Sequence, residues 1–191
     1  MRLGIFGLFT LAVALPAAMA MSVSCGSNGN DNGDGGPGGP GPDGSFGDGH
    51  NCLGCGDGGL LSLAREVFCD AWGYDFQPSN AAGWAERGVK AYAADVFGAD
   101  RDTVELGSVV AMTEVLEHLA DPHGVLAWVH SRPGVSTLVC SSPVNENGDS
   151  HDECNAWAWD AGGYATMVTG AGWTVTDHEI VDLFQVIRAV R

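Results

Sequence analysis

A sharp change of composition near residue 50 limits how much of this chain can fold. Residues 26–50 consist mostly of Gly, Asp, Asn and Pro, whereas apolar side chains recur throughout residues 51–191. The first segment has too few apolar side chains to offset the conformational entropy that ordering would cost. We therefore expect a disordered linker over residues 25–50 and one folded domain over residues 51–191, a length that supports a single hydrophobic core.

The charge balance argues against nucleic acid as a partner. The chain carries 8 Lys plus Arg against 24 Asp plus Glu, a formal net charge of −16, and Lys90 is its one lysine. A protein that binds the phosphate backbone of nucleic acid needs a positively charged surface, which this composition does not supply. A nucleotide-like cofactor stays compatible with the sequence, because backbone amides bind such groups without cationic side chains.

Residues 1–24 have the features of an export signal. Arg2 precedes an almost wholly apolar stretch, and the Ala-Met-Ala run at 18–20 fits a signal-peptide cleavage site. A transmembrane anchor is the competing interpretation, although Pro16 favours a cleaved signal. A third interpretation is a lipoprotein-type leader with a lipid on Cys25. Membrane contact is expected only through this leader or that lipid. The alternatives to a native export signal are a misassigned start, which would leave the domain in the cytoplasm, and a gene fusion.

Beyond residue 51, strand-like and helix-like apolar patterns alternate. Such alternation implies a Rossmann-like, doubly wound α/β fold, with a mostly parallel sheet covered on both faces. The last two strands are too close in sequence for a crossover helix, so they form an antiparallel C-terminal hairpin at the sheet edge. The predicted strands are 69–75, 89–94, 109–112, 135–140, 174–181 and 184–190, and the predicted helices are 60–68, 81–87, 125–129 and one beginning at Glu114.

A glycine-rich turn and two carboxylates mark a candidate ligand site. The run Gly-Cys-Gly-Asp-Gly-Gly at 54–59 precedes a predicted helix, and glycines there let a ligand approach the backbone. Asp75 ends the next predicted strand, about 20 residues after Gly54, a spacing that suits a carboxylate binding ribose hydroxyls. Asp95 ends the following predicted strand and is a second candidate at the same sheet edge.

The run VVAMTEVLEHLADP at residues 109–122 is the most specific motif of the chain. It resembles class I S-adenosylmethionine-dependent methyltransferases, in which the fourth strand leads into an EVLEHL.DP segment. The glycine motif, the Ser-Pro pair at 142–143, the Ala-Gly-Trp turn at 171–173 and the terminal hairpin follow in the family's order. The resemblance covers residues 51–191 and implies S-adenosylmethionine as the cofactor and a small-molecule methyl acceptor.

The resemblance also implies roles for individual residues. Glycines of the turn would line the methionine end of the cofactor, and an acid with its neighbouring aromatic residue would bind the ribose and pack near the adenine. A second acid would accept from the adenine amino group, and the end of the fourth strand would lie where cofactor meets substrate. The glycines of the turn are Gly54, Gly56 and Gly58, and the ribose-binding acid and its aromatic neighbour are Asp75 and Phe76. The second acid is Asp95, and the end of the fourth strand is Thr113 and Glu114.

The chain departs from the family's pattern before the glycine turn. Family members carry an apolar first strand that ends in an acidic residue two positions before the first glycine, where this chain has Cys52. We therefore expect the first strand to be missing or shortened and one contact to the methionine amine to be lost. Two function classes follow: a methyltransferase acting on a small or medium acceptor, with oxygen favoured, and a non-catalytic, exported or membrane-tethered methyltransferase-like domain.

Three residues after the fourth strand are candidates for catalysis. Glu114, Glu117 and His118 would share one face of the helix predicted there. Together with His151, which the resemblance to metal-using small-RNA and ubiquinone-pathway O-methyltransferases suggests, they would hold a divalent cation such as Mg²⁺. Without a metal, Glu114 and His118 are the candidate catalytic residues for an acceptor hydroxyl. The alternative is that this segment only caps and packs a helix.

Two further groups have a structural interpretation beside a functional one. Cys52 and Cys55 have the spacing of a redox pair or, with His50 and Cys69, of a zinc site, but no second cysteine pair follows. Cys55 fits better as a small residue inside the glycine turn. The aromatic residues Trp157, Trp159 and Tyr164 would wall a substrate pocket or, as such residues more often do, belong to the core.

Overall fold

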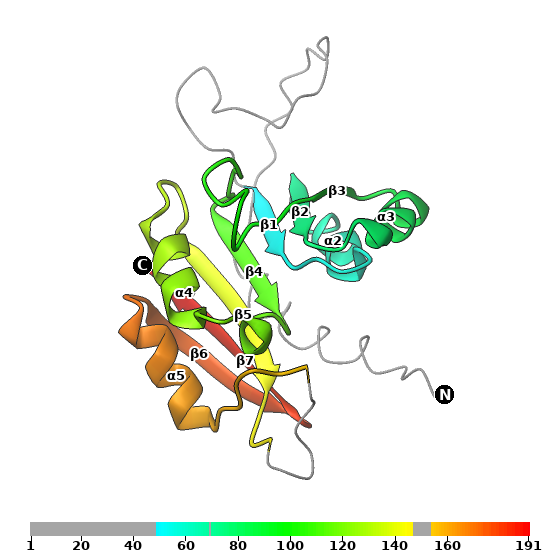
Figure 1. Ribbon diagram of the computed structural model, residues 1–191. Coiled ribbons are helices and arrows are strands. Elements are labelled where there is room, and N and C mark those ends of the chain that lie inside the picture. The colour runs from blue at the N-terminus through cyan, green and yellow to red at the C-terminus, as the bar shows by residue number, and fades with distance from the viewer. Residues whose placement is uncertain (1–48, 69, 147–153) are drawn as a thin grey trace, which may run out of the picture.

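The computed structural model describes residues 49–191, apart from residue 69 and residues 147–153 (Figure 1). The predicted leader, Cys25 and almost all of the predicted linker therefore lie outside the described residues, as do Cys69 and His151. Within the described part of the chain, no helix is long and apolar enough to cross a membrane.

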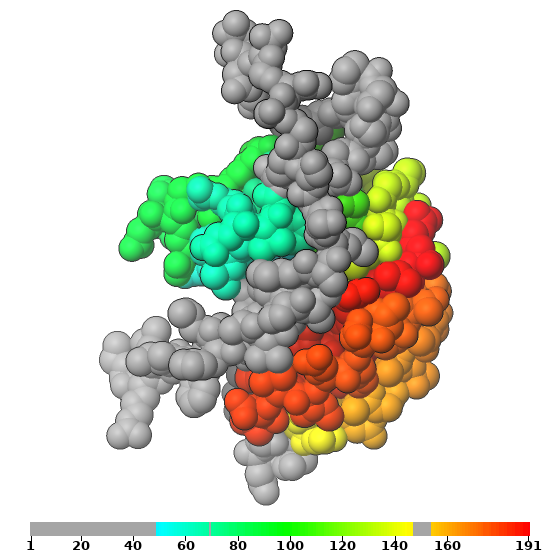
Figure 2. All heavy atoms as spheres, turned by 180° about the vertical axis from the view of Figure 1, so that it is seen from behind, coloured from blue at the N-terminus to red at the C-terminus, as the bar shows by residue number. Residues whose placement is uncertain are grey.

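A single seven-stranded sheet organises the domain, with the strand order β3-β2-β1-β4-β5-β7-β6. The pairs that join β1 to β5 are all parallel, whereas β7 is antiparallel to both β5 and β6. This topology confirms the predicted Rossmann-like α/β fold with an antiparallel C-terminal hairpin, and that hairpin forms part of the molecular surface seen from behind (Figure 2). The strands are β1 (His50–Leu53), β2 (Ala71–Asp75), β3 (Lys90–Ala93), β4 (Val109–Thr113), β5 (Thr137–Pro143), β6 (Thr174–Val181) and β7 (Phe184–Val190).

Helices cover both faces of the sheet. Because successive side chains of a strand point to opposite faces, Cys52 and Leu53 of β1 enter two different apolar clusters. The smaller cluster joins Cys52 to α2 (Gly59–Ala64) and α3 (Ala81–Arg87) on one face. The larger joins Leu53 to α4 (Pro122–Ser131) and α5 (Ala161–Gly170) on the other. The sequence patterns did not predict α5, whose glycines lower its helix propensity.

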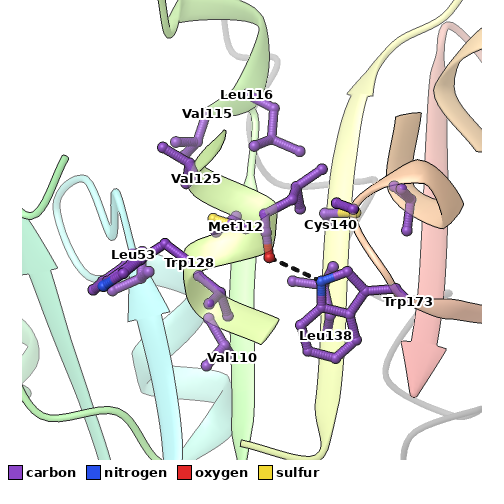
Figure 3. Close-up of a cluster of buried hydrophobic side chains, with 14 of the residues drawn as sticks. Leu53, Val110, Met112, Val115, Leu116, Val125, Trp128, Leu138, Cys140 and Trp173 are labelled. Atoms are coloured by element: carbon purple, nitrogen blue, oxygen red, sulfur yellow. Dashed lines mark hydrogen bonds between the residues drawn. The ribbon is translucent and has the colours of Figure 1, made fainter. Parts of the chain in front are cut away.

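The larger cluster is the main core of the domain. Side chains of β1, β4 and β5 pack against α4 in it (Figure 3). Trp173, which is 2% exposed, fixes α4 to this core, since its indole Nε1–H donates to the backbone oxygen of Leu126 at 3.1 Å. An indole N–H buried among apolar groups needs such a partner, so this bond determines how the ring lies.

The first strand is present, with four residues, between β2 and β4. Of the two expected alternatives, a missing or a shortened first strand, the structure excludes the first. All four of its residues are buried, although two are polar: neither ring nitrogen of His50 has a hydrogen-bond partner among the described residues, and Asn51 donates from Nδ2 to the Trp72 oxygen at 3.3 Å. Burial without partners opposes the charged imidazole and lowers the pKa of His50 to about 4.

The helix predicted from Glu114 does not form there. Glu114 has a left-handed backbone with φ 56°, and a short 3₁₀ turn, η2 (Leu116–His118), follows it. The α-helix begins only at Pro122, where Asp121 caps it by accepting from the Gly124 amide at 2.8 Å. An Asp-Pro pair favours a helix start at that point, because proline lacks the amide that an earlier turn would need. A second short 3₁₀ turn, η1 (Pro78–Asn80), precedes α3.

Candidate functional site

The glycine turn lies at the carboxyl end of β1 and is shaped by its neighbours. The amides of Gly54 and Cys55 both donate to the Tyr74 oxygen of β2, at 2.9 and 3.0 Å. Gly54 has φ +72°, and a Cβ there would lie 2.5 Å from Cγ2 of Val115. Gly56 has φ +52°, but a Cβ there would meet nothing within 4 Å. Gly54 is therefore required by protein packing, whereas Gly56 faces open space.

Asp75 is held at the carboxyl end of β2 by three donors. Its Oδ2 accepts from the Gly56 amide at 2.8 Å, and its Oδ1 accepts from the Gln77 amide at 2.8 Å and from Asn80 Nδ2 at 3.0 Å. A carboxylate has about four acceptor positions, so capacity for a further donor remains. Asp75 and the glycine turn consequently form one hydrogen-bonded unit.

A cavity of about 630 Å³ opens at the carboxyl ends of β1 to β4. It lies where the strand order reverses from β1 to β4, which is where open α/β sheets bind their ligands. The cavity brings together most of the residues that the sequence singled out. Its lining is Gly54, Gly56, Asp75, Phe76, Ala94, Asp95, Val96, Phe97, Thr113, Glu114, Val115, His118 and Leu119.

Two predicted site residues lie elsewhere. Gly58 does not line the cavity but precedes α2, where a Cβ would lie 2.7 Å from Val89 and 3.3 Å from Trp84. Glu117 is 1% exposed and does not line the cavity either. The apolar lining residues Val96 and Phe97 were not among the predicted site residues, although they directly follow Asp95 in the sequence.

Glu114 and Glu117 form a carboxyl pair beside the cavity, in which Glu117 is buried and Glu114 is partly exposed. Ser141 of β5, which the sequence patterns did not single out, donates from Oγ to Glu114 Oε1 at 2.7 Å. Burial, together with the neighbouring Glu114 carboxyl, raises the pKa of Glu117 to about 8. Burial also raises the pKa of Glu114, opposed by the Ser141 hydroxyl. At neutral pH, Glu117 therefore keeps its proton, and Glu114 is the member of the pair that faces the cavity.

His118 lines the cavity with a defined tautomer. Its Nδ1 lies 3.1 Å from the backbone oxygen of Cys154, and a carbonyl oxygen only accepts, so Nδ1 carries the proton. The neutral ring then has Nε2 as its acceptor. His118 is thus placed to accept a hydrogen bond from a molecule in the cavity.

The described residues do not assemble the predicted metal site. The predicted helical face of Glu114, Glu117 and His118 is wrong, because Glu114 precedes a 3₁₀ turn and Glu117 is buried. No three His, Cys, Asp or Glu side chains come together as a metal site in the part of the chain that the structure describes. The fourth predicted ligand, His151, lies outside it.

Of the cysteines and aromatic residues singled out in the sequence, Cys52, Cys55 and Tyr164 are buried, whereas Trp157 is exposed near the cavity. Cys52 and Cys55 are buried, and burial raises the pKa of both thiols, that of Cys55 to about 12, so neither is a thiolate at neutral pH. Tyr164 is fully buried in the core. Trp157 is 42% exposed, stacks on Trp159 with a centroid separation of 6.1 Å, and donates from Nε1 to the oxygen of the cavity residue Leu119 at 2.8 Å. Trp157 therefore lies beside the cavity rim.

The sheet order, the antiparallel β5-β7-β6 arrangement and the cavity define a Rossmann-like α/β domain of the methyltransferase type. Residues 53–185 match the family described as a methyltransferase domain. The chain belongs to this family of methyltransferase domains. No curated protein matches it at a significant level.

Solved structures share the fold at low sequence identity. The putative methyltransferase of Haloferax volcanii, solved in complex with the Trm112 methyltransferase activator, is 18% identical with a TM-score of 0.60, covering 76% of this chain and 83% of that one. An S-adenosylmethionine-dependent methyltransferase from Mesorhizobium loti is 14% identical with a TM-score of 0.58, covering 77% and 93%. The 1,6-didemethyltoxoflavin-N1-methyltransferase of Burkholderia thailandensis, with 1,6-didemethyltoxoflavin and S-adenosylhomocysteine bound, is 17% identical with a TM-score of 0.59, covering 75% and 70%.

Proposed function

We propose that this chain is an S-adenosylmethionine-dependent methyltransferase that methylates a hydroxyl of a small or medium acceptor. The observation that carries the proposal is the unit of Gly56 and Asp75 at the edge of the cavity. A Cβ at Gly56 would point into open space there, and Asp75 keeps acceptor capacity beyond its three donors. These residues fit a ligand that carries both hydroxyl groups and an amino acid moiety.

The cavity lining suits each part of that cofactor. Asp75 would accept from the ribose hydroxyls, and Asp95 would accept from the adenine amino group. Phe76, which is 67% exposed, and Phe97 offer apolar surface to the adenine ring. The backbone of Gly54 and Gly56 and the side chain of Thr113 would border the methionine end.

Glu114 is the proposed general base. Bound S-adenosylmethionine supplies a methyl group whose bond to sulfur breaks as the acceptor oxygen attacks, with the bonding electrons passing to sulfur. Glu114 would take the proton of the acceptor hydroxyl, and burial, which raises the pKa of its carboxyl, makes it a stronger base than an exposed glutamate. Ser141 holds the Glu114 carboxylate in place, and His118 would orient the acceptor through Nε2. Alignment for in-line displacement supplies most of the rate.

A titration with S-adenosylhomocysteine tests the cofactor site. We expect the full 191-residue chain to bind it with a micromolar Kd in calorimetry, and Asp75→Ala to lose binding by about 100-fold, because the carboxylate is removed and three N–H donors lose their acceptor. No binding by the folded wild-type chain would reject the proposal. Assays of acceptor hydroxyls with and without Mg²⁺ would then test for methyl transfer and for any dependence of the rate on a metal.

A non-catalytic methyltransferase-like domain is the second candidate function. It is favoured by β1, which has four residues and carries Cys52 at the position where the family has an acidic side chain. With this candidate we associate export or membrane attachment through residues 1–24 and Cys25. Fractionation of cells expressing the full chain, combined with the same titration, distinguishes an envelope-bound protein without cofactor affinity from a cytoplasmic enzyme.

A further inference from the structure

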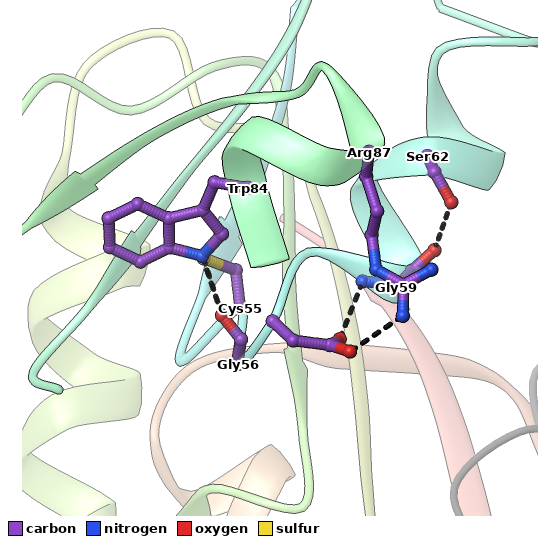
Figure 4. A network of polar contacts seen from close by, with 7 residues as sticks. Cys55, Gly56, Gly59, Ser62, Trp84 and Arg87 are labelled. Atoms are coloured by element: carbon purple, nitrogen blue, oxygen red, sulfur yellow. Dashed lines mark hydrogen bonds and ion pairs between the residues drawn. The ribbon is translucent and has the colours of Figure 1, made fainter. Parts of the chain in front are cut away.

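Helix α3 makes a direct hydrogen bond to the glycine turn. The indole Nε1–H of Trp84 donates to the Gly56 oxygen at 2.7 Å (Figure 4). Trp84 is 7% exposed and packs in the smaller apolar cluster with Cys52, Cys55 and Leu61. It does not line the cavity. Its ring is therefore fixed by packing, and its one polar atom points at the turn.

A second contact joins the same two segments. Arg87, at the end of α3, pairs through Nη2 with Asp57 Oδ2 at 2.6 Å, and Asp57 Oδ1 accepts from the Gly59 amide at 3.1 Å (Figure 4). α3 approaches the turn so closely that a Cβ on Gly83 would lie 2.9 Å from both Cβ and the backbone oxygen of Asp57. The approach of α3 is thus set by backbone contact as well as by polar groups.

These contacts fix Gly56 from both sides. Its amide donates to Asp75, which ends β2, and its oxygen accepts from Trp84 on the following helix. Gly56 itself has φ +52° and no side chain, so without these two bonds its backbone would be free to rotate among several conformations. A binding site that is formed only part of the time loses affinity in proportion to that fraction.

We propose that Trp84, supported by the Asp57–Arg87 pair, is a positioning residue that holds the glycine turn in the conformation that binds the cofactor. The proposal rests on the proposed function, because it assigns a role for the cofactor cavity to a helix outside that cavity. It predicts that cofactor affinity depends on an indole N–H that cannot touch the cofactor.

The test compares two indole-to-backbone bonds in the full chain. Trp84→Phe keeps an aromatic ring in its cluster but removes the donor to Gly56, and Trp173→Phe removes the matching donor to Leu126 in the other half of the molecule. We expect Trp84→Phe to raise the Kd for S-adenosylhomocysteine about tenfold, the value of one buried hydrogen bond. Trp173→Phe should lower Tm by at least as much as Trp84→Phe does, while changing the Kd by less than about twofold.

A second variant and a second measurement support the test. Gly83→Ala improves the helix propensity of α3 but places a methyl group against Asp57, so we expect weaker binding without loss of helix. Hydrogen exchange of the ligand-free chain should show faster exchange of the Gly56 amide in Trp84→Phe, and wild-type exchange there in Trp173→Phe. A purely structural role of Trp84 would not produce this local difference.

The outcomes separate the two proposals. Wild-type affinity in folded Trp84→Phe, or equal losses of affinity in both tryptophan variants, would overturn the positioning role while leaving the cofactor site intact. Absence of binding by the wild-type chain would overturn the proposed function and the positioning role with it. If Trp84→Phe does not fold, Gly83→Ala decides, and unchanged affinity with unchanged exchange at Gly56 would reject the proposal.

Discussion

The turn after β1 and the turn after β4 border the same cavity but are built in opposite ways. In the turn after β1, the residues with positive φ are the glycines Gly54, Gly56 and Gly58. Beside this turn, three N–H groups donate to the single carboxylate of Asp75, which ends β2. After β4, the positive φ falls on Glu114, which is not a glycine, and the Ser141 hydroxyl donates to the Glu114 carboxyl but not to the neighbouring buried carboxyl of Glu117. Left-handed backbone at such a residue costs about 1 kcal/mol or more. Under the proposed function, the first turn would hold the cofactor, and the second combines a left-handed backbone with carboxyl groups of raised pKa beside the reacting groups.

The largest effect should come from removing the proposed base. Glu114→Gln keeps the shape and the Ser141 contact but cannot take a proton, so we expect kcat to fall by about 100-fold or more. The Kd for S-adenosylhomocysteine should change by less than about threefold, in contrast to the loss of binding in Asp75→Ala. Steady-state kinetics and calorimetry check both values. Equal losses of binding in the two variants would mean that the turns do not differ in role.

Gly54 is the position where the two turns touch, and substitution there should cost stability. Gly54→Ala adds a Cβ at φ +72° that lies 2.5 Å from Val115, and we expect a loss of about 2–3 kcal/mol in the free energy of unfolding in urea. The control is Gly56→Ala, which has a positive φ but open space around its Cβ and should cost about 1 kcal/mol. Gly56→Ala should instead weaken S-adenosylhomocysteine binding, because its methyl group enters the cavity.

Glu117 should make stability depend on pH in the second turn. Its pKa is raised from 4.5 to about 8 by burial, so the folded state holds its proton more tightly than the unfolded state. This stabilisation is complete below pH 4.5 and is lost as pH rises through 8. Glu117→Gln should therefore flatten the decline of Tm between about pH 5 and 8, by roughly 5 °C over that range. A parallel decline in wild type and variant would exclude Glu117 as its cause.

His50, in the strand that leads to the first turn, should have the opposite dependence. Its pKa is lowered from 6.5 to about 4, so the unfolded state binds the proton more tightly. Stability is complete above pH 6.5 and is lost as pH falls towards 4. His50→Leu should remove this acid-side loss, which a Tm series at pH 4.5, 5.5 and 7.5 would detect as a difference of a few degrees. An unchanged acid-side slope in His50→Leu would contradict the assignment.

The smallest effect is expected from Trp157, which is joined to the second turn by its hydrogen bond to the Leu119 oxygen. Trp157→Ala removes a half-exposed indole face beside the cavity rim, and we expect the acceptor KM to rise about fivefold. The Kd for S-adenosylhomocysteine should stay within a factor of about two, because Trp157 does not line the cavity. If cofactor affinity falls as much as acceptor affinity, the ring supports the turn and does not contact the acceptor.

The fold was predictable from the sequence because its signals are local. Apolar runs located β2 to β7, and the short connection between β6 and β7 required an antiparallel pair. The backbone of Glu114 was not predictable, because the EVLEH run reads as helix until Asp121 and Pro122 set a later start. Ser141 and Trp84 reach the site through contacts distant in sequence, and nothing in their neighbouring residues distinguishes them from other strand or helix positions.

The place of β1 in the sheet has a consequence for synthesis on the ribosome. β1 pairs with β4, and the contact from Ser108 to Gly49 at the start of that pairing spans 59 residues. At the usual speed of about 5–20 residues per second, β4 emerges from the ribosome roughly 3–12 s after β1. During that interval β1 and β2 can pair while the other edge of β1 stays open. The side chains of His50 and Asn51 are polar, and burying them in the folded domain costs free energy. Before β4 is available, the same polar side chains make β1 less apolar, and its unpaired edge is then a poorer template for aggregation.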